Sequence, residues 1–265
     1  MNLMQFLWSK SRKRHALLEL PFPDAWLGYL SSNVAYSHLL PEPSQQKLRD
    51  ITRIIIAEKS WEGCGGLTLT DEIRVTIAAQ AAILVLGFDE DYYLDVESIL
   101  VYPHGFLVTT QQGEAGRVIR EDLMPLSGEA AMNGPVIVSW QDARHGGLNS
   151  GDGHNVVLHE FAHKLDMRDG AADGVPYLQD AEQVTDWERV MSSEFDTLVL
   201  HCQAGERTLL DHYGATNPAE FFAVATECFF EKPRPMQRHH PELYTVLRDF
   251  YRQDPAALFA AQGKD

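Results

Sequence analysis

The sequence predicts a single α+β domain over residues 1–265, in which helices come first, a small sheet follows, and further helices complete the chain. Three observations support this prediction. Apolar residues recur at helical spacing before residue 87, short Val- and Ile-rich runs occur between residues 99 and 140, and helical spacing returns after Gly146-Gly147. A chain of 265 residues with 45% hydrophobic and 23% charged residues can bury one core without disulfide or metal staples.

The first part of the chain predicts two helices after a separate N-terminal segment. Residues 1–20 end at a Pro-rich break, so we expect them to be loosely attached to the rest of the domain. Ser44 opens a helical pattern, and Asp71 is placed to cap a second, more buried helix that runs to about Leu86. The Gly-rich residues 61–66 predict a loop between these two helices.

The middle and the end of the chain predict strands and then helices. The β-like runs are residues 99–102, 105–108 and 135–140. The later helical patterns are residues 152–166, 183–203, 218–231 and 241–252. We therefore expect a small sheet that packs against the 152–166 helix, with additional helices on both sides.

Charge and cysteine content exclude several classes of protein. The chain has 22 Lys and Arg against 38 Asp and Glu, a net charge of −16, which argues against direct nucleic-acid binding but not against a basic protein or peptide partner. Three scattered cysteines make no disulfide framework. At the N-terminus the apolar residues precede the basic cluster, which is the reverse of an export signal, so we expect none. The longest apolar-rich run, Val75 to Leu86, is too short to span a bilayer. We expect a cytoplasmic protein with no membrane partner.

The motif that carries chemistry is H-E-x-x-H, formed by His159, Glu160 and His163. Residues four apart lie on one face of a helix, so the two imidazoles can bind one metal ion, and Glu160 beside them can take a proton from a water. The helix is also apolar at Val156, Val157, Phe161, Ala162 and Leu165. Buried histidines need partners, which a zinc ion supplies, although Lys164 stands where zinc proteases usually carry an uncharged residue.

A third zinc ligand has to come from another part of the chain. Spacing favours Glu220 over Glu227, and Asp169 is the remaining candidate, so all three stay open at this point. Asn217 is a suitable N-cap for the helix that carries Glu220, and the alternative role of Glu220 is therefore a capping-box residue. Asp166 is better placed to cap or to hydrogen-bond near the site than to bind metal.

Tyr213 is a candidate for stabilising the oxyanion of a tetrahedral intermediate, because it precedes Glu220 by seven residues. The alternative, which the sequence alone favours, is an ordinary half-buried tyrosine at a helix end.

The sequence resembles a known family along most of its length. The matching segments are His159-Glu-Phe-Ala-His-Lys-Leu-Asp166, Gly174-Val-Pro176, Trp187-Glu188, Tyr213, Asn217-Pro-Ala-Glu220, Glu227-Cys-Phe-Phe230, Val101-Tyr-Pro103, Gly134-Pro-Val-Ile-Val-Ser-Trp140 and Phe250-Tyr-Arg-Gln-Asp-Pro255. Together they resemble the Mlc titration factor A family of zinc peptidases.

This resemblance implies a zincin-like fold and one zinc ion per chain, held by His159, His163 and Glu220, with Glu160 as general base. The catalytic region is also similar to that of anthrax lethal factor, in which a tyrosine with the offset of Tyr213 lies by the metal. The family implies cytoplasmic aminopeptidase activity and binding of the transcriptional repressor Mlc. Some members close a further histidine over the zinc, and Arg120 stands at that position here.

Two functions from different classes follow. The first is a zinc peptidase whose peptide substrate binds extended along the edge of the sheet at residues 135–140. The second is a regulatory protein that sequesters the repressor, with peptidase activity secondary. A purely structural zinc site is disfavoured, because two histidines and a carboxylate leave an open position beside a base.

Overall fold

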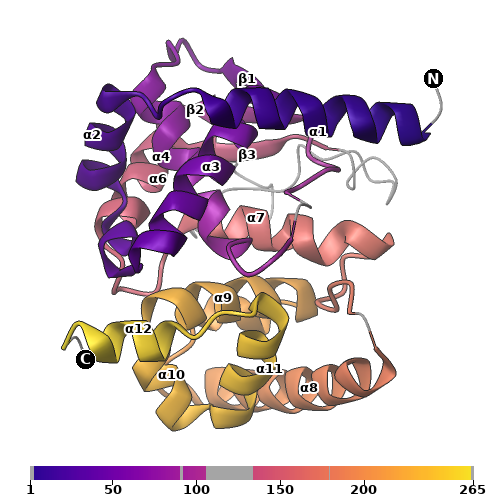
Figure 1. The fold of residues 1–265 in the computed structure, drawn as a ribbon. Coiled ribbons are helices and arrows are strands. Elements are labelled where there is room, and N and C mark those ends of the chain that lie inside the picture. The colour runs from indigo at the N-terminus through magenta and orange to yellow at the C-terminus, as the bar shows by residue number, and fades with distance from the viewer. Residues whose placement is uncertain (1–2, 90–91, 106–133, 179, 264–265) are drawn as a thin grey trace.

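The computed structural model describes residues 3–89, 92–105, 134–178 and 180–263 (Figure 1). Its α-helices are α1 (Leu3–Glu19), α2 (Asp24–Asn33), α3 (Glu42–Glu58), α4 (Asp71–Leu84), α6 (Trp140–Leu148), α7 (Val156–Asp166), α8 (Ala181–Ala204), α9 (Pro218–Glu231), α10 (Pro233–His239), α11 (Pro241–Tyr251) and α12 (Pro255–Ala261). Short 3-10 helices are η1 (Ala35–Leu39), η3 (Met167–Asp169) and η4 (His212–Ala215), and the strands are β1 (Ser60–Gly63), β2 (Ser98–Tyr102) and β3 (Val136–Ser139).

The described strands form one parallel sheet in the order β1-β2-β3. Ile99 of β2 pairs with Trp61 of β1 and with Val136 of β3. Residues 136–139 confirm the strand predicted at 135–140, whereas the prediction of a loop over residues 61–66 was wrong for β1. Of the run 105–108, residues 106–108 lie outside the described residues.

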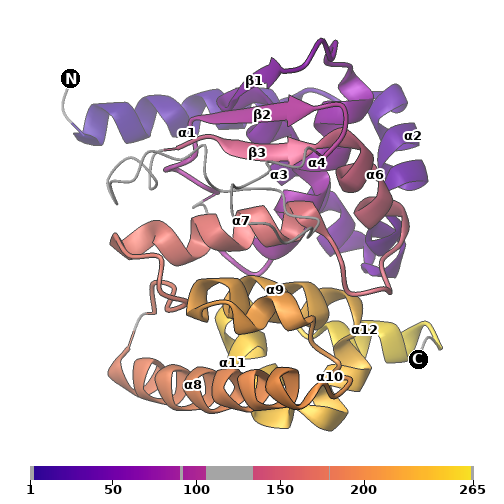
Figure 2. The ribbon, with the colours of Figure 1, turned by 180° about the vertical axis from the view of Figure 1, so that it is seen from behind.

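The layers follow from which faces are apolar. Helices α3 and α4 lie on one side of the sheet, and most residues of α4 are buried. Figure 2 shows the order beyond the edge strand β3: α7 runs beside β3, α9 lies beyond α7, and α8 with α11 lies beyond α9. The helix that carries H-E-x-x-H is therefore enclosed between the sheet and a second helical layer.

Helix ends explain the differences from the predicted boundaries. The cap of α4 is Thr70, whose hydroxyl accepts a hydrogen bond from the backbone N–H of Ile73, and Asp71 is the first helical residue. Helix α7 begins at Val156 rather than 152, because the Asn155 side chain caps it and Gly153 adopts a left-handed conformation with φ +80°. The predictions of α8, α9 and α11 agree with the observed helices within about two residues.

The N-terminal segment is helix α1, which packs on α3. Arg14 donates two hydrogen bonds to Glu58, at 2.6 and 2.9 Å, and its guanidinium lies 5.3 Å from the ring centre of Tyr92. Buried Arg53 donates to the carbonyl oxygens of Leu17 and Leu20. No helix among the described residues is long and apolar enough to cross a membrane.

Helix α6 was not predicted, because Gly146 and Gly147 were interpreted as the boundary before the next helix. A Cβ at Gly147 would lie 2.3 Å from the backbone oxygen of Asn33, which is a steric overlap, and 3.0 Å from Nε2 of Gln80, which is a tight contact. Close packing of α6 on α2 and α4 therefore requires a glycine inside a helix.

Gly174 joins three elements at the end of α7. Its N–H donates to the Asp166 carboxylate at 3.0 Å, and its carbonyl accepts from the indole of Trp187 at 2.9 Å. Its φ is +79°, and a Cβ there would lie 2.4 Å from the backbone oxygen of Pro218, the first residue of α9. The glycine thus allows the chain to pass close to the start of α9.

We predict that Gly174→Ala lowers the free energy of unfolding by about 3 kcal/mol or more, from the positive φ and from the backbone overlap together. The matched control is Gly205→Ala, where φ is +68° but no atom lies within 4 Å of the added Cβ. The control should lose only about 1 kcal/mol. Urea unfolding of both variants measures the difference, and equal losses would show that the contact with Pro218 is unimportant.

Candidate metal centre

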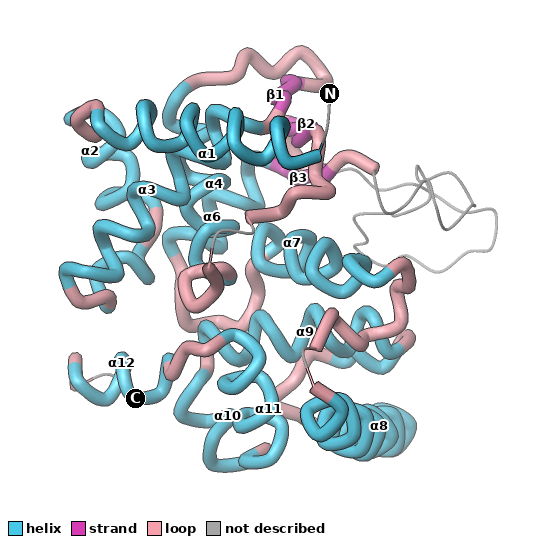
Figure 3. Tube along the Cα trace, turned by 45° about the vertical axis from the view of Figure 1, so that its right-hand side comes forward, coloured by secondary structure: helices cyan, strands magenta, loops and turns pink. Residues whose placement is uncertain are grey.

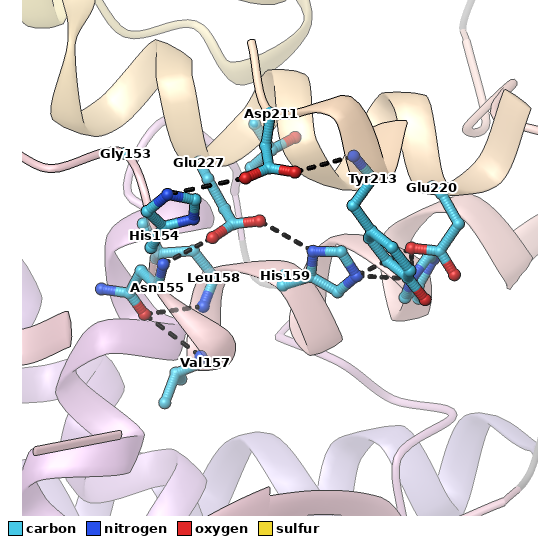
Figure 4. A network of polar contacts seen from close by, with 12 residues as sticks. Gly153, His154, Asn155, Val157, Leu158, His159, Asp211, Tyr213, Glu220 and Glu227 are labelled. Atoms are coloured by element: carbon cyan, nitrogen blue, oxygen red, sulfur yellow. Dashed lines mark hydrogen bonds and ion pairs between the residues drawn. The ribbon is translucent and has the colours of Figure 1, made fainter. Parts of the chain in front are cut away.

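Helix α7 presents His159 and His163 on the face that packs against α9 (Figure 4). Their Nε2 atoms are 3.2 Å apart and their ring centres 4.9 Å apart. The start of the helix is fixed by Asn155, whose side-chain oxygen accepts from the backbone N–H groups of Val157 and Leu158 at 3.1 Å. The cap sets the first turn, and the i, i+4 spacing then brings the two imidazoles together.

Glu220 reaches this pair from the first turn of α9. The Asn217 side chain caps the helix by accepting from the Glu220 N–H at 2.9 Å, as predicted. The Glu220 carboxylate does not turn back to the Asn217 amide as a capping box requires; instead one oxygen lies 3.0 Å from Nε2 of His159 and 3.6 Å from Nε2 of His163. Glu220 is 2% exposed, so this carboxylate is buried against the imidazoles.

These three side chains form a donor set that fits a zinc ion. Among the described residues they are the one group of His, Cys, Asp or Glu whose ligand atoms all lie within 4.8 Å of one another. Tetrahedral zinc with ligands at about 2.0–2.1 Å separates its ligand atoms by about 3.3 Å. The observed separations of 3.0, 3.2 and 3.6 Å bracket that value. Two imidazoles and one carboxylate are also the donors that zinc accepts in catalytic sites.

The electrostatics of the cluster favour bound positive charge. Burial lowers the pKa of His159, but hydrogen bonds to Glu220 and Glu227 outweigh it and raise that pKa well above its usual value. Burial raises the pKa of Glu220, and the neighbouring His159 and His163 outweigh this and hold the pKa far below its usual range. The carboxylate is therefore ionised, as a metal ligand must be.

Glu160 lies beside the donor set without belonging to it. Burial raises the pKa of its carboxyl group, and the nearby imidazoles oppose that effect. A carboxylate with a raised pKa is a better base near neutral pH than an exposed one.

Glu227, the rival candidate for the third ligand, lies on the opposite side of His159. One carboxylate oxygen is 2.8 Å from Nδ1 of His159, and the other accepts from the backbone N–H of Asn155. Glu227 therefore orients the imidazole from behind, so that Nε2 faces Glu220 and His163.

Glu231, one turn later on α9, was not singled out by sequence reasoning. Its two oxygens accept from the Asn155 side chain at 3.1 Å and from the Gly153 N–H at 3.0 Å. The i, i+4 repeat of Glu227 and Glu231 on an otherwise apolar helix was the available signal. Both carboxylates hold the loop that enters α7.

Tyr213 lies over the cluster, in η4. Its ring centre is 5.9 Å from that of His159, and the residue is 37% exposed, so it lies between the buried donor set and solvent. Asp211 fixes this turn by accepting from the Tyr213 N–H at 2.7 Å, and its other oxygen lies 3.6 Å from Nε2 of His154 (Figure 4).

The remaining candidates lie elsewhere. Asp166 accepts from the Gly174 N–H, which is the hydrogen-bonding role predicted for it. The side chain of Asp169 and all of Arg120 lie outside the described residues. Lys164 is buried and donates to the backbone oxygen of Gly134 at 3.1 Å, so its charge ties α7 to the start of β3.

Comparisons with known proteins identify relatives along nearly the whole chain. A family model described as glucose-regulated metallo-peptidase M90 matches residues 8–252. An uncharacterized protein of Synechocystis sp. is 36% identical over 260 residues, which cover 96% of this chain and 94% of the relative. Mlc titration factor A of Yersinia pestis and that of Yersinia pseudotuberculosis are each 30% identical over 258 residues, which cover 96% of this chain and 92% of each relative.

The pH dependence of stability tests the burial of Glu231, because burial raises the pKa of its carboxyl group to about 8. Between the unfolded pKa of about 4.3 and this value, the unfolded chain has lost the proton that the folded chain keeps. The free energy of unfolding should therefore fall across this window, by about 2–4 kcal/mol from this group, and level off above it.

In Glu231→Gln, which does not titrate, we predict a shallower fall between pH 5 and pH 8 by roughly that amount. Urea unfolding in the presence of a chelator measures it, so that metal binding does not contribute. Parallel pH profiles for the variant and the unmodified protein would contradict the prediction.

Proposed function

The chain belongs to the glucose-regulated metallo-peptidase M90 family, and from that premise we propose that it is a cytoplasmic zinc peptidase of aminopeptidase type. The family supports a metallopeptidase. The observation that carries the finer proposal is the convergence of His159, His163 and Glu220 at separations that suit one tetrahedral zinc ion. We assign these three residues as the zinc ligands, with one zinc ion per chain.

Bound zinc supplies Lewis acidity, which makes water nucleophilic near neutral pH and polarises a peptide carbonyl. Glu160 is the proposed general base that takes the proton of the attacking water and passes it to the leaving amine. Its raised pKa, which follows from burial, suits both transfers. Its position next to His159 on α7 keeps it close to the reacting atoms and outside the donor set.

Tyr213 is the proposed oxyanion stabiliser. Its ring lies beside His159, and the residue is 37% exposed. A phenolic hydroxyl that donates to the developing oxyanion stabilises the transition state more than the substrate.

The substrate is a peptide, which we propose to bind extended along β3. This strand is at the edge of the described sheet, and α7 packs directly against it. Backbone hydrogen bonds from an edge strand fix a peptide without reading its sequence, and the side chains around the metal centre then select the residue at the cleaved bond.

A second function is favoured by the relatives named Mlc titration factor A. In this alternative, the chain binds and sequesters the transcriptional repressor Mlc, and peptidase activity is secondary. The chain's net charge of −16 is compatible with a basic protein partner.

The assignment of ligands predicts a graded loss of zinc along α9. Glu220→Ala, like His159→Ala or His163→Ala, should lose zinc on dialysis, because two ligands are too few to hold it. Glu227→Gln should keep zinc but bind it about 10- to 100-fold more weakly, because an amide cannot accept from both His159 and Asn155.

Glu231→Gln is the matched control, since it changes a buried carboxylate of the same helix that does not contact His159. It should keep wild-type zinc affinity. Metal analysis and competition with a chelating dye measure the series. If Glu220→Ala retained zinc while Glu227→Ala lost it, the two glutamates would have to exchange roles.

Catalysis predicts a different pattern from zinc binding. Glu160→Gln should keep zinc and the fold but lose about 10²–10⁴-fold in the hydrolysis of an amino-acid p-nitroanilide, because an amide takes no proton at neutral pH. Tyr213→Phe should lose about 10- to 1,000-fold with unchanged zinc. Full activity of Glu160→Gln would end the proposed mechanism. Wild-type repressor binding by both variants would show that hydrolysis and repressor binding are separable.

A further inference from the structure

Helices α8 and α11 lie on the part of the molecule that α9 separates from α7 (Figure 3). A groove of about 620 Å³ lies between these two helices. Its base is formed by the buried residues Trp187 and Val190, and the half-buried residues Leu178, Val246 and Phe250 line it. The groove is large enough for several side chains of a partner, and it contains none of the residues of the metal centre.

The rim of this groove is acidic. Its carboxylates are Asp180, Glu182, Asp186, Glu242 and Asp249. Arg189 is the one basic residue in the lining, so the groove carries an excess of four negative charges. An apolar floor between carboxylate rims is complementary to a segment with apolar residues on one face and Lys or Arg on the other.

Helix stability explains only some of these carboxylates. Asp180 caps α8 by accepting from the Gln183 N–H at 2.8 Å, and Glu242 lies in the first turn of α11, where negative charge is favourable. Asp249 lies in the last turn of α11, where the helix dipole disfavours a carboxylate. Arg248, which is outside the lining, donates to it at 2.9 and 3.0 Å.

The groove already binds one guanidinium, that of Arg189. Nη1 of Arg189 on α8 lies 2.6 Å from the Glu242 carboxylate on α11, and Nη2 lies 3.7 Å from Asp186. This contact spans the two helices that form the walls. An arginine or lysine of a partner could pair in the same way with the other carboxylates of the rim.

We propose that the groove between α8 and α11 is a docking site for a basic amphipathic segment of a partner protein. The apolar face of the segment packs on Leu178, Val246 and Phe250, and its Lys or Arg side chains lie against the rim carboxylates. This site is independent of the proposed metal centre, and its failure would leave the peptidase assignment unaffected.

The test uses a fluorescein-labelled helical peptide of Leu and Lys with one apolar and one basic face, followed by fluorescence anisotropy. A scrambled peptide of the same composition, which has no apolar face, is the peptide control. Binding is measured on the full chain carrying Glu160→Gln, so that hydrolysis of the probe is not mistaken for weak binding. We expect one peptide per chain, with clearly weaker binding of the scrambled peptide.

Two variants locate the site. The combined change Glu182→Gln, Asp186→Asn and Asp249→Asn should weaken binding by about 10-fold, and Thr245→Lys, which adds a positive charge at an exposed position of the lining, should weaken it similarly. The matched control neutralises three exposed carboxylates on the sheet side, Glu62, Asp95 and Glu97, and should change affinity by less than about 3-fold.

Equal losses in the groove variant and the control variant would overturn the proposal, because attraction would then come from net charge alone. Equal binding of the scrambled peptide, or no binding, would also overturn it. Sedimentation equilibrium tests another occupant: a dimer that Thr245→Lys dissociates would assign the groove to a second copy of this chain.

Discussion

The imidazole of His159 is held between two carboxylates of one helix, and the arrangement of α7 against α9 depends on it. Glu227 contacts Nδ1 at 2.8 Å and Glu220 lies 3.0 Å from Nε2. The two glutamates are seven residues apart, which is two helical turns, so they reach the ring from opposite ends. A slide of α9 by one residue would remove both contacts together.

Burying this much charge is costly, and the surrounding structure shows how the cost is offset. Glu227 accepts from the Asn155 N–H and faces Nδ1 of His159, while Glu231 accepts from the Asn155 side chain and from the Gly153 N–H. The Asn155 side chain also caps α7. Gly174 lets the chain cross the start of α9, where Asn217 fixes the turn that carries Glu220. The buried carboxyl groups of Glu227 and Glu231 are tolerated because backbone and side-chain N–H groups donate hydrogen bonds to them.

The local parts of the site were predictable from sequence, and the parts that depend on tertiary packing were not. The spacing of His159 and His163 follows from helix geometry alone, and the Asn217 cap was recognised with it. Spacing favoured Glu220 over Glu227 as the third ligand, but it does not show which end of the His159 imidazole each carboxylate faces. Strand β1 was missed because a run of four residues that ends in glycine carries little β signal. Helix α6 was missed because its glycines are required by close tertiary contacts, which the local sequence does not show.

The acidic residues of the chain include two separate groups, one buried between α7 and α9 and one along the groove between α8 and α11. Carboxylates at the proposed metal centre face imidazoles, backbone N–H groups and the Asn155 side chain inside the protein, so little of their field reaches solvent. Carboxylates along the groove between α8 and α11 are mostly exposed, and their field extends about one Debye length, roughly 10 Å at moderate salt. An approaching basic partner is therefore attracted by the groove rather than by the metal centre. Because α9 lies between these two regions and contacts both α7 and α8, the proposed docking groove and the proposed metal centre lie on different sides of this helix.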